Sequence, residues 1–426
     1  MPSDEEIYAM NNFGWKALNI GKLYVYPFIL VFLAYGTSVL YLTPTQESSI
    51  VNQIVYTFAY AFSAGVLLTR HRRFLMFVAA RSLPILVLIL LAFVSIFTSD
   101  FPKQVFFGIV HKIGTVFVAL LAAMLLMNNS ILFFRSLLNV FFAYFVVTLL
   151  FSIYYPAMAN MPEAFYGKFR AGLRGLTLHP NTLGGICVVS AWVSFSVMYL
   201  VNETRIWSKR LAIASILFAL YFLYKSNSMT AILVVAGMFA IVIWFQFVMG
   251  SNSGVGLRIF FVVAGFFFLV SLLWVVKPEV FTIEYFFHAI GRDTSFSGRS
   301  NLWDLAIKGF LEKPYLGWGE DNLHTLLKHY RVLFAQFHNG YLDFLVRGGV
   351  VYVVILAIIF FQMLVSLRRM ASAGDYLYLV VISYFVPWLV HNITEASIYR
   401  NTHILWFVFL ICYFSCVGRK FSFKGS

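Results

Sequence analysis

Long apolar stretches recur along the chain and alternate with short polar connections. A helix needs about 20 mainly apolar residues to cross a bilayer, so each of these stretches predicts a transmembrane helix. We predict about twelve, at residues 23–42, 51–69, 82–98, 106–127, 131–155, 182–201, 211–224, 231–249, 259–276, 349–366, 376–394 and 404–418. The pattern therefore predicts an all-α membrane protein, in which residues 1–426 form a single polytopic membrane domain.

The composition supports this prediction. Hydrophobic residues make up 61% of the chain and charged residues only 11%, whereas soluble domains carry about 25% charged residues. The three cysteines, Cys187, Cys412 and Cys416, lie in apolar stretches, and we expect them to be packing residues rather than metal ligands. Residues 1–19 lack the basic start and cleavage site of a signal peptide, so we expect the first helix to remain as an anchor.

The basic residues orient the predicted helices. They fall in alternate connections, and the positive-inside rule places those connections and both termini in the cytoplasm. The residues concerned are Arg70, Arg72, Arg73, Arg205, Lys209, Arg210, Arg258, Arg368, Arg369, Arg419 and Lys420. Much of the net charge of +14 is explained in this way, and the sequence shows no motif that binds nucleic acid.

Two outward segments, residues 156–181 and residues 277–348, are too long and too polar to be simple turns. The second holds eight Lys or Arg residues, eight Asp or Glu residues and four His residues. Within it, residues 303–311 have the pattern of a short amphipathic helix lying on the membrane surface. We predict that the two segments are loops that together form a site.

Arginine and histidine residues gather in these loops beside glycine. The planar fork of arginine suits phosphate oxygens, and a neutral histidine can take a proton from a hydroxyl group. A solvated loop with scattered charge is the alternative, and we prefer it for Lys308, Glu312, Lys313 and Lys328. The candidate site residues are Arg170, Arg174, His179 and Asn181 in the first loop and Arg292, Arg299, His338 and Asn339 in the second.

The end of the second loop carries a spaced motif. His338 and Asn339 are followed by nine residues, Gly349, two further residues and Tyr352. This spacing resembles the signature of the O-antigen ligase and polymerase superfamily, a group of bacterial polytopic membrane glycosyltransferases. Other segments resemble further parts of that family in the same order: residues 174–185, residues 298–303 with 314–319, and residues 392–395 with Asn401 and Trp406.

The resemblance implies a reaction. Members of the superfamily take a glycan from an undecaprenyl-diphosphate carrier and join it to an acceptor hydroxyl, on the lipopolysaccharide core or on another lipid-linked glycan. It implies no metal ion and no cofactor, with His338 as the base and Arg174 and Arg299 stabilising the leaving diphosphate. Asn339 and Asp343 would fix the tautomer of the His338 ring. The residues expected to bind substrate are Arg170, His179, Asn181, Arg292, Asn339, Tyr352 and Glu395.

The resemblance also implies a place in the cell, the bacterial inner membrane, with the active site facing the periplasm. Among family activities we favour a polymerase over a ligase. A flippase or transporter of lipid-linked oligosaccharide is the alternative from another class, although the sequence shows no convincing internal repeat. A non-catalytic assembly or sensor protein gives no reason for the arginines and the histidine.

The roles of several individual residues also have alternative explanations. Gly349 and Tyr352 also suit close helix packing and an interfacial aromatic ring. Glu395 would pair either with Arg400 at the surface or with an arginine of the site. Lys112, inside a predicted span, is expected at the membrane interface, although an ionisable residue there is a functional candidate by default.

Overall fold

The computed structural model describes residues 25–36, 50–161, 172–201, 203–244, 299–320, 325–326, 329–330, 336–401 and 403–419. These residues are mostly helical, which confirms the predicted all-α class. The elements are α2 (Tyr26–Gly36), α3 (Ile50–Thr69), α4 (Arg72–Arg81), α5 (Leu83–Ile96), α6 (Pro102–Asn128), α7 (Ser130–Tyr154), α8 (Pro156–Ala159), α9 (Pro180–Phe195), the π-helical turn η3 (Ser196–Leu200), α10 (Ile206–Ser226), α11 (Met229–Trp244), α14 (Arg299–Glu312), α16 (Gly340–Ser372), α17 (Leu377–Thr394) and α18 (Ile404–Gly418).

Six helices in the described residues are long and apolar enough to cross a membrane: α6, α7, α9 with η3, α10, α16 and α17. Each matches one of the predicted spans. A seventh span results if α4 and α5 are taken together, although the pair is bent by 81°. The chain is therefore a multi-pass membrane protein, while the predicted total of about twelve spans stays a prediction.

Several boundaries differ from the prediction. Helix α10 begins at Ile206 and has 21 residues, so the predicted span at residues 211–224 was too short. Helix α16 runs from Gly340 to Ser372 across a backbone break at Gly349, so the predicted span at residues 349–366 begins at the break and a helical segment precedes it. Helix α5 has only 14 residues, fewer than a span alone requires. The predicted span at residues 259–276 lies outside the described residues.

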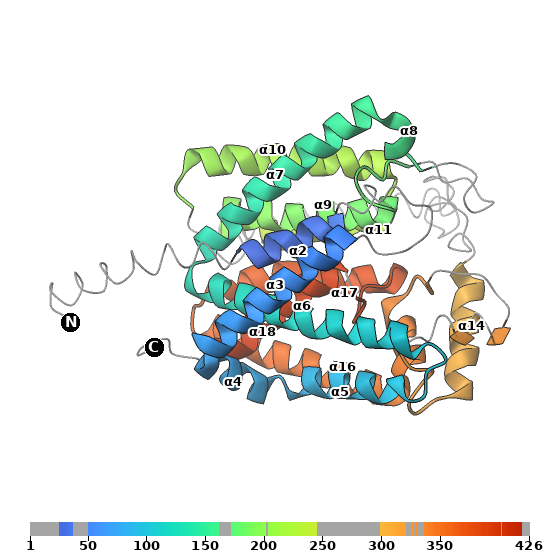
Figure 1. Ribbon diagram of the computed structural model, residues 1–426. Coiled ribbons are helices and arrows are strands. Elements are labelled where there is room, and N and C mark those ends of the chain that lie inside the picture. Colours follow the sequence, from blue (N-terminus) through green and yellow to red (C-terminus); the bar gives the residue numbers. More distant parts are fainter. Residues whose placement is uncertain are drawn as a thin grey trace, which may run out of the picture.

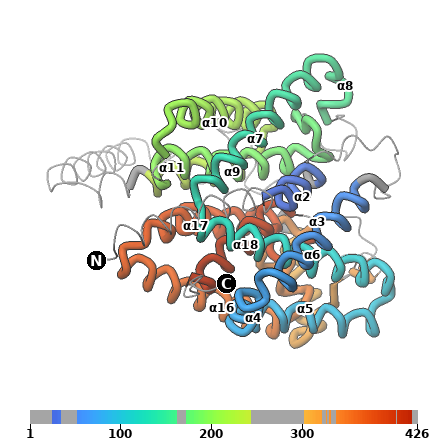
Figure 2. Tube along the Cα trace, turned by 60° about the vertical axis from the view of Figure 1, so that its left-hand side comes forward, coloured from blue at the N-terminus to red at the C-terminus, as the bar shows by residue number. Residues whose placement is uncertain are grey.

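Helix α18 forms the centre of the bundle. Every one of its residues is buried, as expected for a helix that is apolar on all sides. It packs against α6, α9, α16 and α17 (Figure 2). The ring of Phe409 stacks on Trp388 with centroids 4.2 Å apart and on Trp406 at 4.9 Å.

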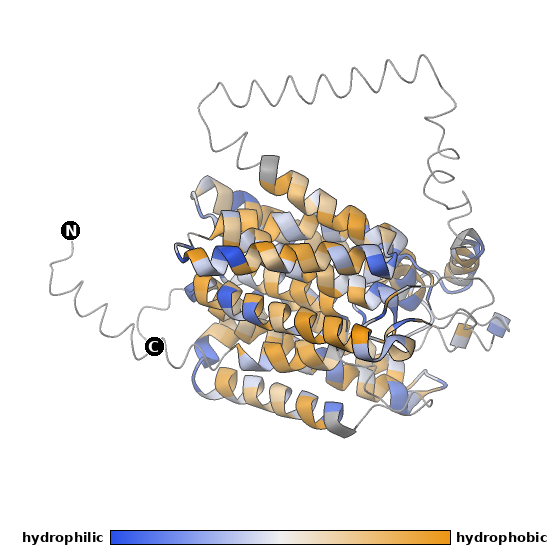
Figure 3. Ribbon diagram, turned by 90° about the horizontal axis from the view of Figure 1, so that it is seen from above, coloured by the Kyte–Doolittle hydropathy of each residue, from blue (hydrophilic) through white to orange (hydrophobic). Residues whose placement is uncertain are grey.

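The outer helices consist mostly of apolar residues (Figure 3), and many of their large side chains are exposed. Large exposed examples are Ile153 on α7, Leu217 on α10 and Phe361 on α16. Apolar surface of this extent is costly in water and suits contact with lipid. The distribution agrees with a buried α18 and a lipid-facing periphery.

Helix α14 lies across one end of the bundle (Figure 1). It packs on the start of α16 through a small apolar cluster that includes Ala306, Phe337 and Val346. The Trp303 indole N–H donates to the Phe337 carbonyl at 3.1 Å. The helix predicted at residues 303–311 is confirmed, and it borders the end of the bundle where the candidate site residues gather.

Candidate active site

A backbone break inside α16 joins this helix to the segment that follows α14. Gly349 has φ 61° and ψ −156°, a conformation that a side chain rarely permits. A Cβ atom there would also collide with the carbonyl oxygen of Tyr315. Trp318 N–H donates to the Val346 carbonyl, before the break, at 2.9 Å. Gly349 is thus explained by backbone geometry, and the break fixes residues 314–319 on α16.

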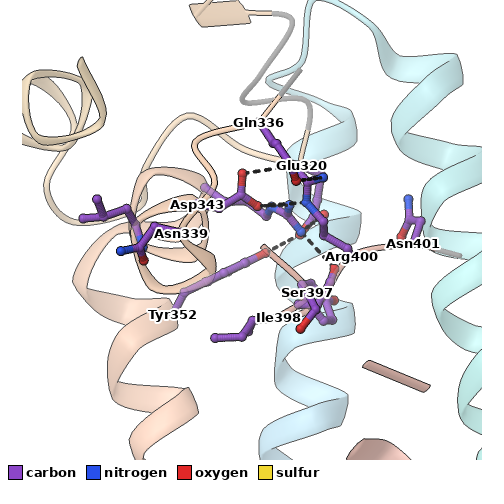
Figure 4. Close-up of polar contacts among 12 residues, drawn as sticks. Glu320, Gln336, Asn339, Asp343, Tyr352, Ser397, Ile398, Arg400 and Asn401 are labelled. Carbon is purple, nitrogen blue, oxygen red and sulfur yellow. Dashed lines mark hydrogen bonds and ion pairs between the residues drawn. The ribbon is translucent and has the colours of Figure 1, made fainter. Parts of the chain in front are cut away.

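Five charged side chains meet at this end of the bundle, and we call them the ion cluster: Lys112, Glu320, Asp343, Arg347 and Arg400. Figure 4 shows Glu320, Asp343 and Arg400 among their polar neighbours. Lys112 Nζ lies 2.8 Å from Glu320 Oε2. Asp343 pairs with Arg347 at 2.9 Å and with Arg400 at 3.3 Å. All except Arg400 have side chains that are at most 8% exposed.

The ion cluster connects four separate parts of the chain: α6, the segment after α14, the start of α16 and the residues after α17. Tyr352 on α16 donates its hydroxyl to Glu320 Oε1 at 2.9 Å, and Lys112 Nζ donates to Asn401 Oδ1 at 2.7 Å. Burial alone raises the pKa of Glu320, but Lys112 and Arg347 outweigh burial, so that the pKa is lowered. Glu320 is therefore charged at neutral pH and fastens the second loop to the bundle.

The end of the first loop is built around Arg174 and Gly175. Arg174 Nε donates to the Met158 carbonyl at 2.9 Å, which anchors the guanidinium group against α8. Gly175 has φ 57°, and a Cβ atom there would lie 2.6 Å from Thr148 Cγ2. Glycine is therefore required at the turn that leads from Arg174 into α9.

A second polar group lies at the same end of the bundle, and we call it the His338 network: Asn181, Gln336, His338 and Glu395. Asn181, in the first turn of α9, donates its amide to Glu395 Oε1 at 2.7 Å. Glu395 Oε2 lies 3.2 Å from His338 Nδ1 and 3.2 Å from Gln336 Nε2. The first loop, the second loop and the end of α17 thus meet at one carboxylate.

The backbone and the side chain of His338 are both held in place. His338 has φ 52°, a left-handed conformation that costs free energy in a residue with a side chain and often marks functional sites. Its side chain is 26% exposed, while that of Glu395 is 8% exposed. Gln336 Nε2 also lies 3.0 Å from His338 Nδ1. We assign the proton to Nδ1, because the Glu395 carboxylate can only accept, and this assignment leaves Nε2 as the basic nitrogen.

Two neighbouring residues bear on this assignment. Arg400 Nη1 donates to Gln336 Oε1 at 3.0 Å, so the Gln336 amide turns its N–H₂ toward Glu395. Burial, helped by the nearby His391 and Arg400, lowers the pKa of His403 to about 3. His403 is therefore a very weak base and a poor proton acceptor.

The structure brings together three of the predicted site residues, namely Asn181, His338 and Glu395. Others contact the protein itself: the His179 ring accepts from Asn181 N–H as the N-cap of α9, and Asn339 caps α16 by accepting from Tyr341 N–H at 3.0 Å. Arg174 contacts the Met158 carbonyl, and its role in catalysis stays a prediction.

The remaining predicted residues are less fully described. Arg170 and Arg292 lie outside the described residues. Arg299 is described only as the first backbone position of α14, and its side chain lies outside the description. Tyr352 is buried, with its hydroxyl on Glu320, so an interfacial position for this ring is wrong.

The predicted support for the His338 ring needs correction. Glu395 makes the contact to Nδ1 that we expected from Asp343 or Asn339. Asp343 is instead part of the ion cluster, because an acid four residues before Arg347 on one helix faces that arginine. Arg400, one of the two alternative partners expected for Glu395, pairs instead with Asp343.

Sequence reasoning missed most of the ion cluster and Gln336. Lys112 carried a signal, because a lysine within an apolar span needs a partner, yet we expected it at the interface and it is buried. The spacing of Asp343 and Arg347 was also a signal, concealed by starting the helix at residue 349. Glu320 and Gln336 gave no local signal, since their partners are remote in sequence.

The described residues contain no group of three or more His, Cys, Asp or Glu side chains placed to hold a metal ion. The fold defines a multi-pass helical membrane protein, with the ion cluster and the His338 network at one end of the bundle. Residues 211–357 match the family model described as O-antigen ligase, and this match confirms the predicted resemblance to the O-antigen ligase and polymerase superfamily. It runs from α10 into α16 and includes His338, Gly349 and Tyr352. No curated protein matches the chain.

Proposed function

We propose that this protein transfers a glycan from an undecaprenyl-diphosphate carrier to an acceptor hydroxyl, with His338 as general base. The contact between His338 Nδ1 and Glu395 carries the proposal, because it orients a partly exposed ring and directs Nε2 away from the carboxylate. The O-antigen ligase match over residues 211–357 supports a glycan-transferring activity in polysaccharide synthesis.

The proposed step is a displacement at the anomeric carbon of the donor. His338 Nε2 takes the proton of the acceptor hydroxyl while the oxygen attacks the anomeric carbon. The bond from that carbon to the diphosphate breaks, and the electron pair leaves with undecaprenyl diphosphate. Glu395 stabilises the imidazolium that forms, and general-base catalysis of this kind contributes about 10²–10⁴ in rate.

Arginine side chains neutralise the leaving diphosphate in this proposal. Arg174 uses Nε for the Met158 carbonyl, and this contact leaves its two terminal nitrogens to grip phosphate oxygens. The superfamily resemblance assigns similar roles to Arg170, Arg292 and Arg299. Fixed cations of this kind replace a metal ion in stabilising the developing charge.

The proposed orientation places both termini in the cytoplasm and the His338 network on the periplasmic side. The acceptor is another lipid-linked glycan if the protein is a polymerase, which we favour, or the lipopolysaccharide core if it is a ligase. An assay that offers the two acceptors separately distinguishes these activities, since each product has a different lipid anchor.

The proposal predicts that His338→Ala abolishes glycan transfer. Purified full-length protein in detergent is mixed with undecaprenyl-diphosphate-linked repeat units and each acceptor, without nucleotide. Release of undecaprenyl diphosphate and glycan length are then measured. We expect a rate loss of about 10²–10⁴ with unchanged thermal unfolding. The matched control is His329→Ala, because His329 lies in the same loop with 49% of its side chain exposed.

The outcomes separate the competing functions. A wild-type protein that leaves the lipid-linked units chemically unchanged would support a flippase and not an enzyme. Full activity of His338→Ala would overturn the assigned base. Loss of wild-type activity with a chelator, restored by Mg²⁺, would overturn the role of the arginines while keeping the enzyme class.

A further inference from the structure

A cavity of about 540 Å³ lies between α4, α16 and α18, near the C-terminal ends of all three helices. The His338 network adjoins the other end of α16, and the helical part after the break at Gly349, residues 350–372, alone spans about 35 Å. In Figure 1, α4 and α14 accordingly lie at opposite ends of the bundle. The cavity is therefore separate from the site described above.

The mouth of the cavity is cationic. Three arginines line it, Arg81, Arg369 and Arg419, together with one acid, Asp375. Arg419 and Asp375 pair with each other, so they contribute little net charge. Among the described residues no carboxylate pairs with Arg81 or Arg369. The cavity thus offers two exposed guanidinium groups to an anion.

The same cavity has an apolar wall. Phe361, Val365 and Arg369 follow one another at intervals of four residues on α16, so they lie along one face of the helix. Over these eight residues, about 12 Å, the face changes from aromatic and aliphatic to cationic. Met370 and Val417 add apolar surface from α16 and α18.

A neighbouring cavity extends the cationic part. It shares Val365, Arg369 and Ala373 with the first cavity and adds Arg368 and Ser372. No carboxylate in the described part of the chain pairs with Arg368. Both cavities therefore meet at Arg369, which is the centre of the cationic surface.

We propose that this cavity binds an anionic phospholipid, with the headgroup phosphate on Arg81 and Arg369 and an acyl chain along Phe361 and Val365. A free phosphate would use only the arginines and would leave the apolar stripe without a partner. A zwitterionic lipid gains less from the site, because its ammonium group opposes the two arginines. Basic pockets between transmembrane helices are a known way to hold anionic headgroups.

The test uses purified full-length protein and native mass spectrometry. Wild-type protein is titrated separately with phosphatidylglycerol and with phosphatidylethanolamine of the same acyl chains. We expect tighter binding of phosphatidylglycerol, and about fivefold weaker binding in Arg369→Gln and in Arg81→Gln, as expected for one arginine at a lipid surface. The control is Arg73→Gln on α4, because Arg73 is exposed and does not line the cavity.

Each result bears on the proposal. Equal binding of the two lipids by wild-type protein would overturn it without reference to any variant. Displacement of phosphatidylglycerol by millimolar inorganic phosphate would show a site for a free anion, and would overturn the choice of a lipid. Equal losses in Arg73→Gln and Arg369→Gln would show a diffuse surface charge and not a binding cavity.

Discussion

The ion cluster and the His338 network occupy the same end of the bundle, and both unite the second loop with the helices. They differ in how deeply the side chains are buried and in how many charged partners each side chain has. Glu320 and Asp343 are 4% and 1% exposed and each pairs with two cations. His338 is 26% exposed and has one ring nitrogen held by a carboxylate. Arg400 links the two groups by pairing with Asp343 and donating to Gln336.

The difference distinguishes charged side chains that stabilise the fold from side chains that can take part in a reaction. A buried charge that is paired on every side cannot exchange partners with a substrate, because breaking the pair leaves an uncompensated charge. A partly exposed histidine with a fixed tautomer can gain and lose a proton. We infer that the ion cluster holds the loop in place and that the His338 network performs the chemistry.

The largest predicted effect is on stability. Glu320→Ala leaves Lys112 and Arg347 buried without that carboxylate, and removal of one partner from a buried ion pair costs about 3–5 kcal/mol. We expect a clear fall in the midpoint of thermal unfolding in detergent, with loss of activity as a consequence. The measurement is the unfolding midpoint of wild-type and variant protein.

The control for this prediction is Glu312→Ala. Glu312 lies on α14 with 43% of its side chain exposed, and exposed ion pairs contribute about 0–1 kcal/mol. The pKa of Glu320 is lowered from its ordinary value of 4.5, so its contribution is present at neutral pH and is lost as the pH falls through the lowered value. A Glu320→Ala variant as stable as Glu312→Ala would contradict the structural role of the ion cluster.

The helices were largely predictable from the sequence, because apolar length is a local property. The predicted range 404–418 coincides with α18, and α6 and α7 lie within a few residues of their predicted ends. The predicted start at residue 349 coincides with the backbone break in α16. The helical segment before the break, which begins at Gly340, was not predicted, and residues 314–319 bond to backbone groups on both sides of the break.

The candidate site was predictable only in part. His338 and Asn181 were identified from short motifs in polar loops. Such motifs indicate which residues are candidates, but not which side chains they contact. Glu395 was expected to contact an arginine, and its contact with His338 depends on two chain segments 57 residues apart. A contact of this kind depends on the tertiary structure, so a local sequence pattern cannot predict it.

The second prediction changes the chemistry without the fold. Glu395→Gln keeps the shape of the side chain and can keep the hydrogen bond to Asn181, but it removes the charge that stabilises the His338 imidazolium. We expect the rate of glycan transfer to fall about 10²-fold with little change in unfolding midpoint.

The matched control for Glu395→Gln is Glu312→Gln, which removes a charge from an exposed position on the same side of the bundle. Its rate should equal that of the wild type. A Glu395→Gln variant that loses activity together with thermal stability would indicate a purely structural role for Glu395. Unchanged activity would contradict its role as a positioning residue.

The smallest predicted effect falls on the link between the two groups. Gln336→Ala removes the amide that joins Arg400 to Glu395 and lies 3.0 Å from His338 Nδ1, while the Asp343–Arg400 pair and the Glu395–His338 contact remain. We expect a loss of about 0.5–1.5 kcal/mol in stability, typical of one hydrogen bond, and a rate reduced by about tenfold or less.

A double-mutant cycle with Glu395→Gln is the sharper measurement, since the effects of substitutions within one network are not additive. If Gln336 acts only by orienting Glu395, its removal should cost less rate in the Glu395→Gln background than in the wild type. Equal rate losses in both backgrounds would mean that Gln336 acts independently of Glu395, and that the two groups are not coupled through it.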